Sequence, residues 1–228
     1  MSSLDAIRAT IGGKARVACR TVYHPELNEV TSVSPVPNEG NGPAPLAARR
    51  STPARLLEAP GPDRPTLLRM LEAAVRVPDH GRRVPFRFIT IEGEARHRLG
   101  EELEQIARKR DPDTPPAVLE KDRQRFSRAP LVVAVVAVLD PEDHKIPAQE
   151  RLLSAGCVCF SLLVAAQAEG FGAQWLTGWP AYDDDVLARL GLSEHERIAG
   201  FIHIGTPTAE APERERPDPR DLLRDWRP

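Results

Sequence analysis

The residues best suited to chemistry form a short run of hydrogen-bond donors, Arg49-Arg50-Ser51. Two adjacent guanidiniums and a hydroxyl stand there with no carboxylate between them. Arginine presents a planar fork of N–H groups that matches two oxygens of one phosphate, and serine adds another donor. The run indicates a local anion site, although a solvated basic patch explains most exposed Arg-Arg pairs.

A second polar cluster, Arg76-Val77-Pro78-Asp79-His80-Gly81, lies downstream of the first. Two such clusters in an otherwise ordinary sequence suggest one bound anion or cofactor. A flavin mononucleotide (FMN) needs cations and hydroxyls for its phosphate, donors at the ring edge and apolar walls beside the ring. The residues that could supply these groups are Arg49, Arg50 and Ser51 for the phosphate, Arg76 and His80 for ring or ribityl oxygens, and Trp175, Leu176 and Thr177 for the wall.

Hydrolytic and metal-dependent chemistry find little support in the same sequence. The six histidines do not form H-E-x-x-H or another metal spacing, and no G-x-S-x-G is present. Asp79-His80 together with His144 could begin a metal or acid–base site, but a third ligand at a suitable spacing is missing. We interpret His203, which lies in an apolar run, as a hydrogen-bonded core or interface residue, and Cys157 and Cys159 as small core residues.

Composition and charge restrict the class of protein. The chain has 228 residues, with 31 basic and 33 acidic side chains and a formal charge of −2, so no global field favours nucleic acid or anionic lipid. Three cysteines without a framework pattern favour a reducing compartment. The first residues lack a cationic segment leading into an apolar one, as a signal peptide would have, and the apolar run 131–139 is too short to span a bilayer. We expect a cytoplasmic protein that binds neither nucleic acid nor membrane.

Helical and strand patterns alternate along the chain from residue 63 onward. Asp63 and Pro65 indicate a helix start, and Pro78 indicates its end, which would place Arg76 on the last helical turn. Residues 1–47 lack periodicity and predict a flexible extension, with a short helix near 4–10. The expected helices cover 94–110, 117–127, 150–169 and 183–190, and the expected strands cover 86–91, 131–138, 170–177 and 198–204. This order predicts an α+β protein or a three-layer α/β/α sandwich, and no G-x-G-x-x-G supports a dinucleotide fold.

Eight segments, in order, resemble the nitroreductase family of FMN-dependent, NAD(P)H-oxidising enzymes, in particular its small YdjA-like branch. The resemblance covers residue 48 to the C-terminus. Its segments are Arg49-Arg50-Ser51, Arg76-Val77-Pro78-Asp79-His80, Pro85-Phe86-Arg87-Phe88 with Ile91-Glu92-Gly93-Glu94, Arg128-Ala129-Pro130-Leu131, His144-Lys145-Ile146-Pro147, Ser154-Ala155-Gly156-Cys157, Gly170-Phe171-Gly172, and Gly200-Phe201-Ile202 with Gly205-Thr206-Pro207.

The resemblance implies a central, mainly antiparallel sheet between helices and a homodimer with two flavin sites at its interface. It implies that Arg49, Arg50, Ser51, Arg76 and His80 bind FMN, that Trp175, Leu176 and Thr177 line it, and that the C-terminal tail reaches the partner. The activity implied is ping-pong hydride transfer from NAD(P)H through the flavin to an electron-poor acceptor, such as a nitroaromatic or a quinone. In the family a full helix precedes Arg49, whereas 42–45 interrupt it here. The alternative is therefore a flavin-binding protein with little turnover, acting as sensor, carrier or interaction partner.

Overall fold

The computed structural model describes residues 44–228. A five-stranded antiparallel sheet forms its centre, in the order β1-β5-β3-β2, with β4 also paired to β5. The strands are β1 Leu57–Glu58, β2 Phe86–Glu92, β3 Leu131–Val138, β4 Gly172–Leu176 and β5 Glu196–Pro207. The expected mixed fold with an antiparallel sheet is confirmed.

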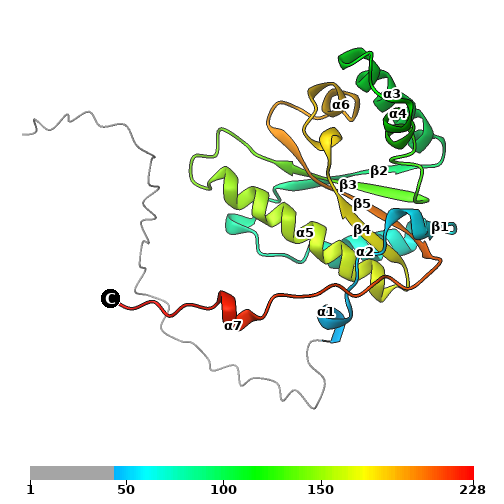
Figure 1. Ribbon diagram of the computed structural model, residues 1–228. Coiled ribbons are helices and arrows are strands. Elements are labelled where there is room, and N and C mark those ends of the chain that lie inside the picture. The colour runs from blue at the N-terminus through cyan, green and yellow to red at the C-terminus, as the bar shows by residue number, and fades with distance from the viewer. Residues whose placement is uncertain (1–43) are drawn as a thin grey trace, which may run out of the picture. The chain divides into compact units, whose positions relative to one another are not determined.

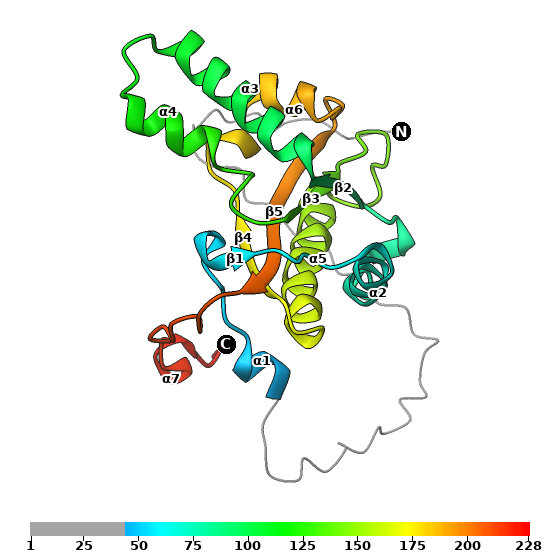
Figure 2. The ribbon, with the colours of Figure 1, turned by 90° about the vertical axis from the view of Figure 1, so that its right-hand side faces the viewer.

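Helices cover both faces of this sheet (Figures 1 and 2). One face packs on α2 and α5, and the other packs on α3, on Phe126 after α4, and on α6. The helices are α1 Ala44–Ala48, α2 Arg64–Ala74, α3 Glu94–Arg110, α4 Pro116–Arg123, α5 Ala148–Ala168, α6 Asp184–Arg189 and α7 Pro219–Leu222. The architecture is therefore a three-layer α/β/α sandwich.

β3 is central to both layers, because successive side chains of a strand point to opposite faces. Val133 and Val135 pack toward α5, whereas Val132 and Ala134 pack toward α3, and all four are fully buried. A continuously apolar sequence is what a strand covered on both faces requires. The predicted strand 131–138 coincides with β3.

Helix α5 has one buried and one exposed apolar face. Its length and composition would suffice for a membrane span, yet nine of its 21 residues are buried inside the protein. The buried residues are Arg151, Ser154, Ala155, Val158, Cys159, Leu162, Leu163, Ala165 and Ala166. On the opposite side, Leu153, Cys157 and Phe160 recur at helical spacing and are exposed. The prediction that Cys157 is a core residue is therefore wrong, because it lies about 200° around the helix from the buried Cys159.

The predicted end of helix α2 also needs correction. Helix α2 begins as expected, with the Asp63 carboxylate accepting a hydrogen bond from Thr66 N, but it ends at Ala74, so Arg76 lies beyond the helix. The chain leaves the helix early enough for the Pro78 carbonyl to accept a hydrogen bond from Ser154 Oγ on α5 (2.9 Å). The expected helix at 4–10 and most of the expected extension 1–47 lie outside the described residues, and only 44–47 belong to α1.

Candidate functional site

The Arg49-Arg50-Ser51 run lies at the C-terminal end of α5. Gln167, in the last turn of that helix, holds the backbone on both sides of Arg49: its Oε1 accepts from Arg50 N (3.1 Å) and its Nε2 donates to Ala48 O (3.0 Å). The next residues run along β4, with Thr52 N donating to Ala173 O (3.0 Å). The backbone of the motif is thus fixed by these contacts, and Arg50 Nη1 also donates to Ala47 O (2.7 Å).

Within this motif Arg50 lines a cavity of about 640 Å³. Arg50, Thr52 and Gln167 line it together with the residues that begin β4 and follow β5. Arg50 also forms an ion pair with Glu213 of the C-terminal tail, and Arg49 Nη1 donates to Ser51 Oγ (3.2 Å). Because the Arg50–Glu213 pair is exposed on both sides, it contributes little energy and can be replaced by another anion.

A second cavity, of about 280 Å³, lies beside Leu176 of β4 and is strongly basic. Its cationic lining residues are Arg55, Lys121, Arg125 and Arg128. Among residues 44–228, Asp122 is the one carboxylate bonded to this group: it accepts from Arg125 Nη2 (2.7 Å) and also from Trp179 Nε1 (3.1 Å). No sequence motif predicted this cavity, because its cations come from two distant parts of the chain, residue 55 and residues 121–128. The one sequence feature that could have indicated this cavity is Arg55, which lies four residues after Ser51.

His203 lies on the same face of the sheet as the basic cavity, in register with Gln174 of β4. Its ring stacks on Phe126, and burial, together with the charges of Arg125 and Arg128, lowers its pKa to about 4. The core position expected for His203 is confirmed. The expectation of a hydrogen-bonded residue is not met, because its Nδ1 is buried and has no partner among residues 44–228.

The three predicted wall residues do not share one face. Trp175 is 37% exposed, lies over Gly200, and donates from Nε1 to Ala199 O (3.1 Å). It lines an apolar cavity of about 790 Å³ between α5 and α6, with Leu152 and Gly156. Leu176 faces the basic cavity on the other side of β4, because neighbouring residues of a strand alternate in direction. Thr177, just after the strand, is half-buried.

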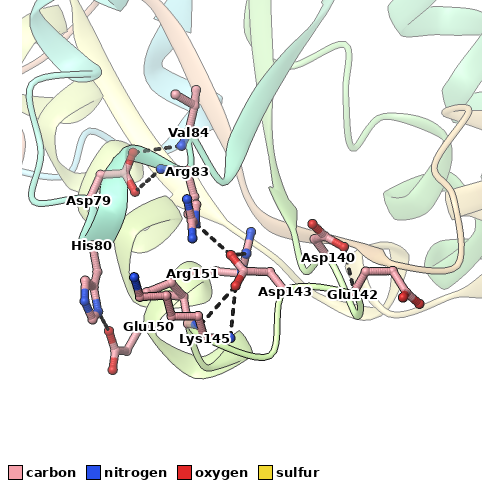
Figure 3. Close-up of polar contacts among 11 residues, drawn as sticks. Asp79, His80, Arg83, Val84, Asp140, Glu142, Asp143, Lys145, Glu150 and Arg151 are labelled. Carbon is pink, nitrogen blue, oxygen red and sulfur yellow. Dashed lines mark hydrogen bonds and ion pairs between the residues drawn. The ribbon is translucent and has the colours of Figure 1, made fainter.

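Arg76 and His80 lie at the opposite end of α5 from Arg49. The imidazole of His80 contacts Glu150 of the first helical turn, with 2.6 Å between Nδ1 and Oε2 (Figure 3). Arg76 is exposed, and its guanidinium has no polar partner in the described part of the chain. Glu150 and Gln167 are separated by 17 residues, which corresponds to about 25 Å along the helix. One chain alone therefore does not bring the two predicted clusters together.

Comparisons with known proteins agree with this geometry. YdjA of Escherichia coli strain K12, which carries the name of an NAD(P)H nitroreductase, is 38% identical over 166 residues, covering 73% of this chain and 88% of that protein. A Desulfovibrio desulfuricans structure solved with FMN has a TM-score of 0.63 at 19% identity and covers 81% and 96% of the two chains. The nitroreductase CinD of Lactococcus lactis, solved with chloramphenicol, has a TM-score of 0.62 at 18% identity and covers 81% and 98%.

The two structural likenesses establish a shared fold, and the sequence comparisons go further. The model of the nitroreductase family matches residues 46–206, which include the Arg49-Arg50-Ser51 run, all five strands except the last residue of β5, and helices α2 to α6. With this match and the identity to YdjA, the chain belongs to the nitroreductase family.

Proposed function

We propose that the protein is an FMN-dependent oxidoreductase that oxidises NAD(P)H and reduces an electron-poor small molecule. When bound, FMN accepts a hydride from NAD(P)H and passes the electrons to the acceptor, so that no protein nucleophile is required. The role of the chain is then to bind, orient and shield the cofactor. The observation that supports this most strongly is the pair of cavities along β4, one beside Arg50 and the other lined by four cations.

The donors at the two cavities fit the two polar ends of FMN. Arg49, Arg50 and Ser51 would hold the phosphate, since charge-assisted bonds from guanidinium to phosphate are short and strong. Arg55 and Lys121 would face the ring edge, where a nearby cation favours the negative charge that develops on reduction. β4 has five residues, which span about 13 Å, so both cavities lie along one strand.

The second cluster reaches this site only if two copies of the chain combine. The exposed apolar face of α5, with Leu153, Cys157 and Phe160, has no partner among the described residues and would be covered by the same face of a second copy. If the two-fold axis passes through that face perpendicular to α5, the α5 helices of the two copies lie antiparallel. Arg76 and His80 of one copy would then lie near Arg49 of the other. We propose a homodimer of this kind, in which the tail with Leu222, Leu223 and Trp226, all exposed, contacts the partner.

The proposed acceptor is a nitroaromatic or a quinone, reduced in a ping-pong reaction after the oxidised nicotinamide has left. The structure of CinD in complex with chloramphenicol supports the proposal that a small organic molecule is the acceptor. The apolar cavity beside Trp175 offers aromatic and aliphatic walls in the same region of the chain. A location in the cytoplasm stays a prediction from the sequence.

One observation favours a second function, a flavin-binding protein with little turnover. In the part of the chain that the structure describes, helix α1 has five residues, and a short helix at this position leaves less surface for dimer contacts. In this case FMN would bind, but its reduction by NADH or NADPH would be slow.

An absorbance spectrum of the purified protein with added FMN tests these proposals. We expect a flavin band near 450 nm that bleaches anaerobically with NADH or NADPH and returns on addition of a nitroaromatic or a quinone. A bound flavin that resists both nicotinamides would favour the second function, and a protein that binds no FMN would exclude both. Sedimentation equilibrium tests the dimer, and Phe160→Glu should convert it to monomers.

A further inference from the structure

The loop that carries His80 is strained and braced from within. Between α2 and β2, Gly81, Arg82 and Val84 all have positive φ (71°, 53° and 48°), which is unusual for arginine and rarer for a β-branched valine. The Asp79 carboxylate accepts hydrogen bonds from Arg83 N (3.0 Å) and Val84 N (2.8 Å). These two bonds close the loop on itself.

The same loop is tied to the rest of the protein through Asp143 (Figure 3). Arg83 Nε donates to Asp143 Oδ2 (2.7 Å), and the same oxygen accepts from Arg151 of α5. The other oxygen, Oδ1, accepts from Lys145 N (3.0 Å) and Ile146 N (3.3 Å). The Asp143 side chain is 13% exposed and that of Arg151 only 4%, so the contact is largely shielded from water.

The ties converge on one turn of α5. Arg151 follows Glu150, which contacts His80, and Ser154 donates to the Pro78 carbonyl one turn later. Although desolvation raises it, hydrogen bonds from Lys145 N and Arg83 bring the pKa of Asp143 below its usual value. Asp143 is therefore a carboxylate at neutral pH, as its two arginine contacts require.

We propose that Arg83 and Asp143 are positioning residues that fix His80 by joining its loop to the first turn of α5. The inference rests on the proposed function, since it takes His80 as a group that meets the flavin of the partner subunit. A strained loop stays in one conformation only where its surroundings hold it. Removal of the Arg83 contact takes away the tie to Asp143 and leaves the Asp79 brace, the Ser154–Pro78 bond and the His80–Glu150 contact. His80 would then sample positions away from its partner site.

A double-mutant cycle on the full-length protein tests this role. The variants are Arg83→Gln, His80→Gln and the double variant, with FMN affinity measured by flavin fluorescence and the ring environment by visible circular dichroism. We expect Arg83→Gln to weaken FMN binding roughly fivefold, which is the upper range for a partly exposed ion pair, and to change the dichroism. The double variant should bind as weakly as His80→Gln alone, because Arg83 acts through His80. Arg83→Lys should recover part of the loss.

The matched control is Arg108→Gln, which removes an exposed Arg108–Glu104 pair from α3, far from the loop. If Arg83→Gln binds FMN as well as this control while His80→Gln is impaired, the positioning role is wrong and the proposed function stands. Losses that add in the double variant also overturn it. Wild-type binding by His80→Gln removes the flavin role of His80 and this inference with it, whereas a wild-type chain that binds no FMN overturns the proposed function.

Discussion

The two ends of helix α5 satisfy their charged groups in opposite ways. At the N-terminal end, the buried Arg151 pairs with Asp143, which also accepts from Arg83, and Arg151 Nε is buried without a partner among residues 44–228. At the C-terminal end, Gln167 fixes the backbone of the Arg49–Ser51 run, and Arg50 has one exposed carboxylate partner, Glu213. The buried contacts at the N-terminal end stabilise the folded structure, whereas the partly exposed cations at the C-terminal end can bind a ligand. The N-terminal end should therefore govern stability and the C-terminal end affinity.

The largest effect expected from this difference is on stability. Arg151→Met removes the buried partner of Asp143, which keeps its contacts to Arg83, Lys145 N and Ile146 N. The loss of one bond to a charged group should cost up to about 3 kcal/mol, so the midpoint of thermal unfolding should fall by up to roughly 12 °C. Arg50→Met at the other end should change the free energy of unfolding by less than about 0.5 kcal/mol. Equal midpoints for the two variants, measured without FMN, would contradict the distinction.

The buried His203 limits the pH range in which the stability effects at the two ends of α5 can be compared. Burial lowers the pKa of His203 to about 4 in the folded protein, whereas an unfolded histidine titrates near 6.5. Between these values the unfolded chain binds a proton that the folded chain does not, so the free energy of unfolding falls as the pH decreases from about 6.5 to about 4, by roughly 3 kcal/mol. Urea unfolding at several pH values should show this slope, and His203→Gln should lose it. A slope that persists in the variant would assign the acid sensitivity elsewhere.

At the C-terminal end the main effect should be on cofactor affinity. Arg50→Ala removes a charge-assisted contact to phosphate of about 1.5–3 kcal/mol, so FMN should bind roughly 10- to 100-fold more weakly. The control is Arg69→Ala, which breaks an exposed pair with Glu169 near the same end of α5. Unchanged flavin retention by Arg50→Ala would place this guanidinium on the solvated surface.

Local patterns were sufficient for the regular elements. The predicted helix 94–110 coincides with α3, because its charged and apolar residues alternate with a clear helical period and Gly93 precedes it. The two-residue strand β1 has no pattern of its own and exists only through its pairing with the end of β5. The exposure of Cys157 was missed because a helix that is apolar nearly all round looks buried in sequence, whether the protein or a second copy covers it.

The sequence indicated the motifs of the candidate site, but not the tertiary contacts that hold these motifs in place. Arg49, Arg50, Ser51 and His80 are recognisable by residue type and spacing, and the structure places Arg50 at a cavity and His80 on a braced loop. Gln167 holds Arg50 across 117 residues of sequence, and the basic cavity joins Arg55 to residues of α4 and beyond. Contacts of this kind depend on the tertiary fold, so no local sequence pattern predicts them.

The smallest expected effect separates the two ends of α5 within one helix. Gln167→Leu keeps the size of the side chain but removes both hydrogen bonds to the backbone around Arg49, each worth about 1 kcal/mol. FMN binding should weaken up to roughly tenfold because the run is no longer held in place. Gln167→Glu keeps the acceptor for Arg50 N and loses the donor to Ala48 O, so its effect should be smaller. Gln149→Leu, at an exposed position in the first turn, is the control and should bind FMN normally; a comparable loss there would mean that the whole helix, and not its C-terminal end, governs affinity.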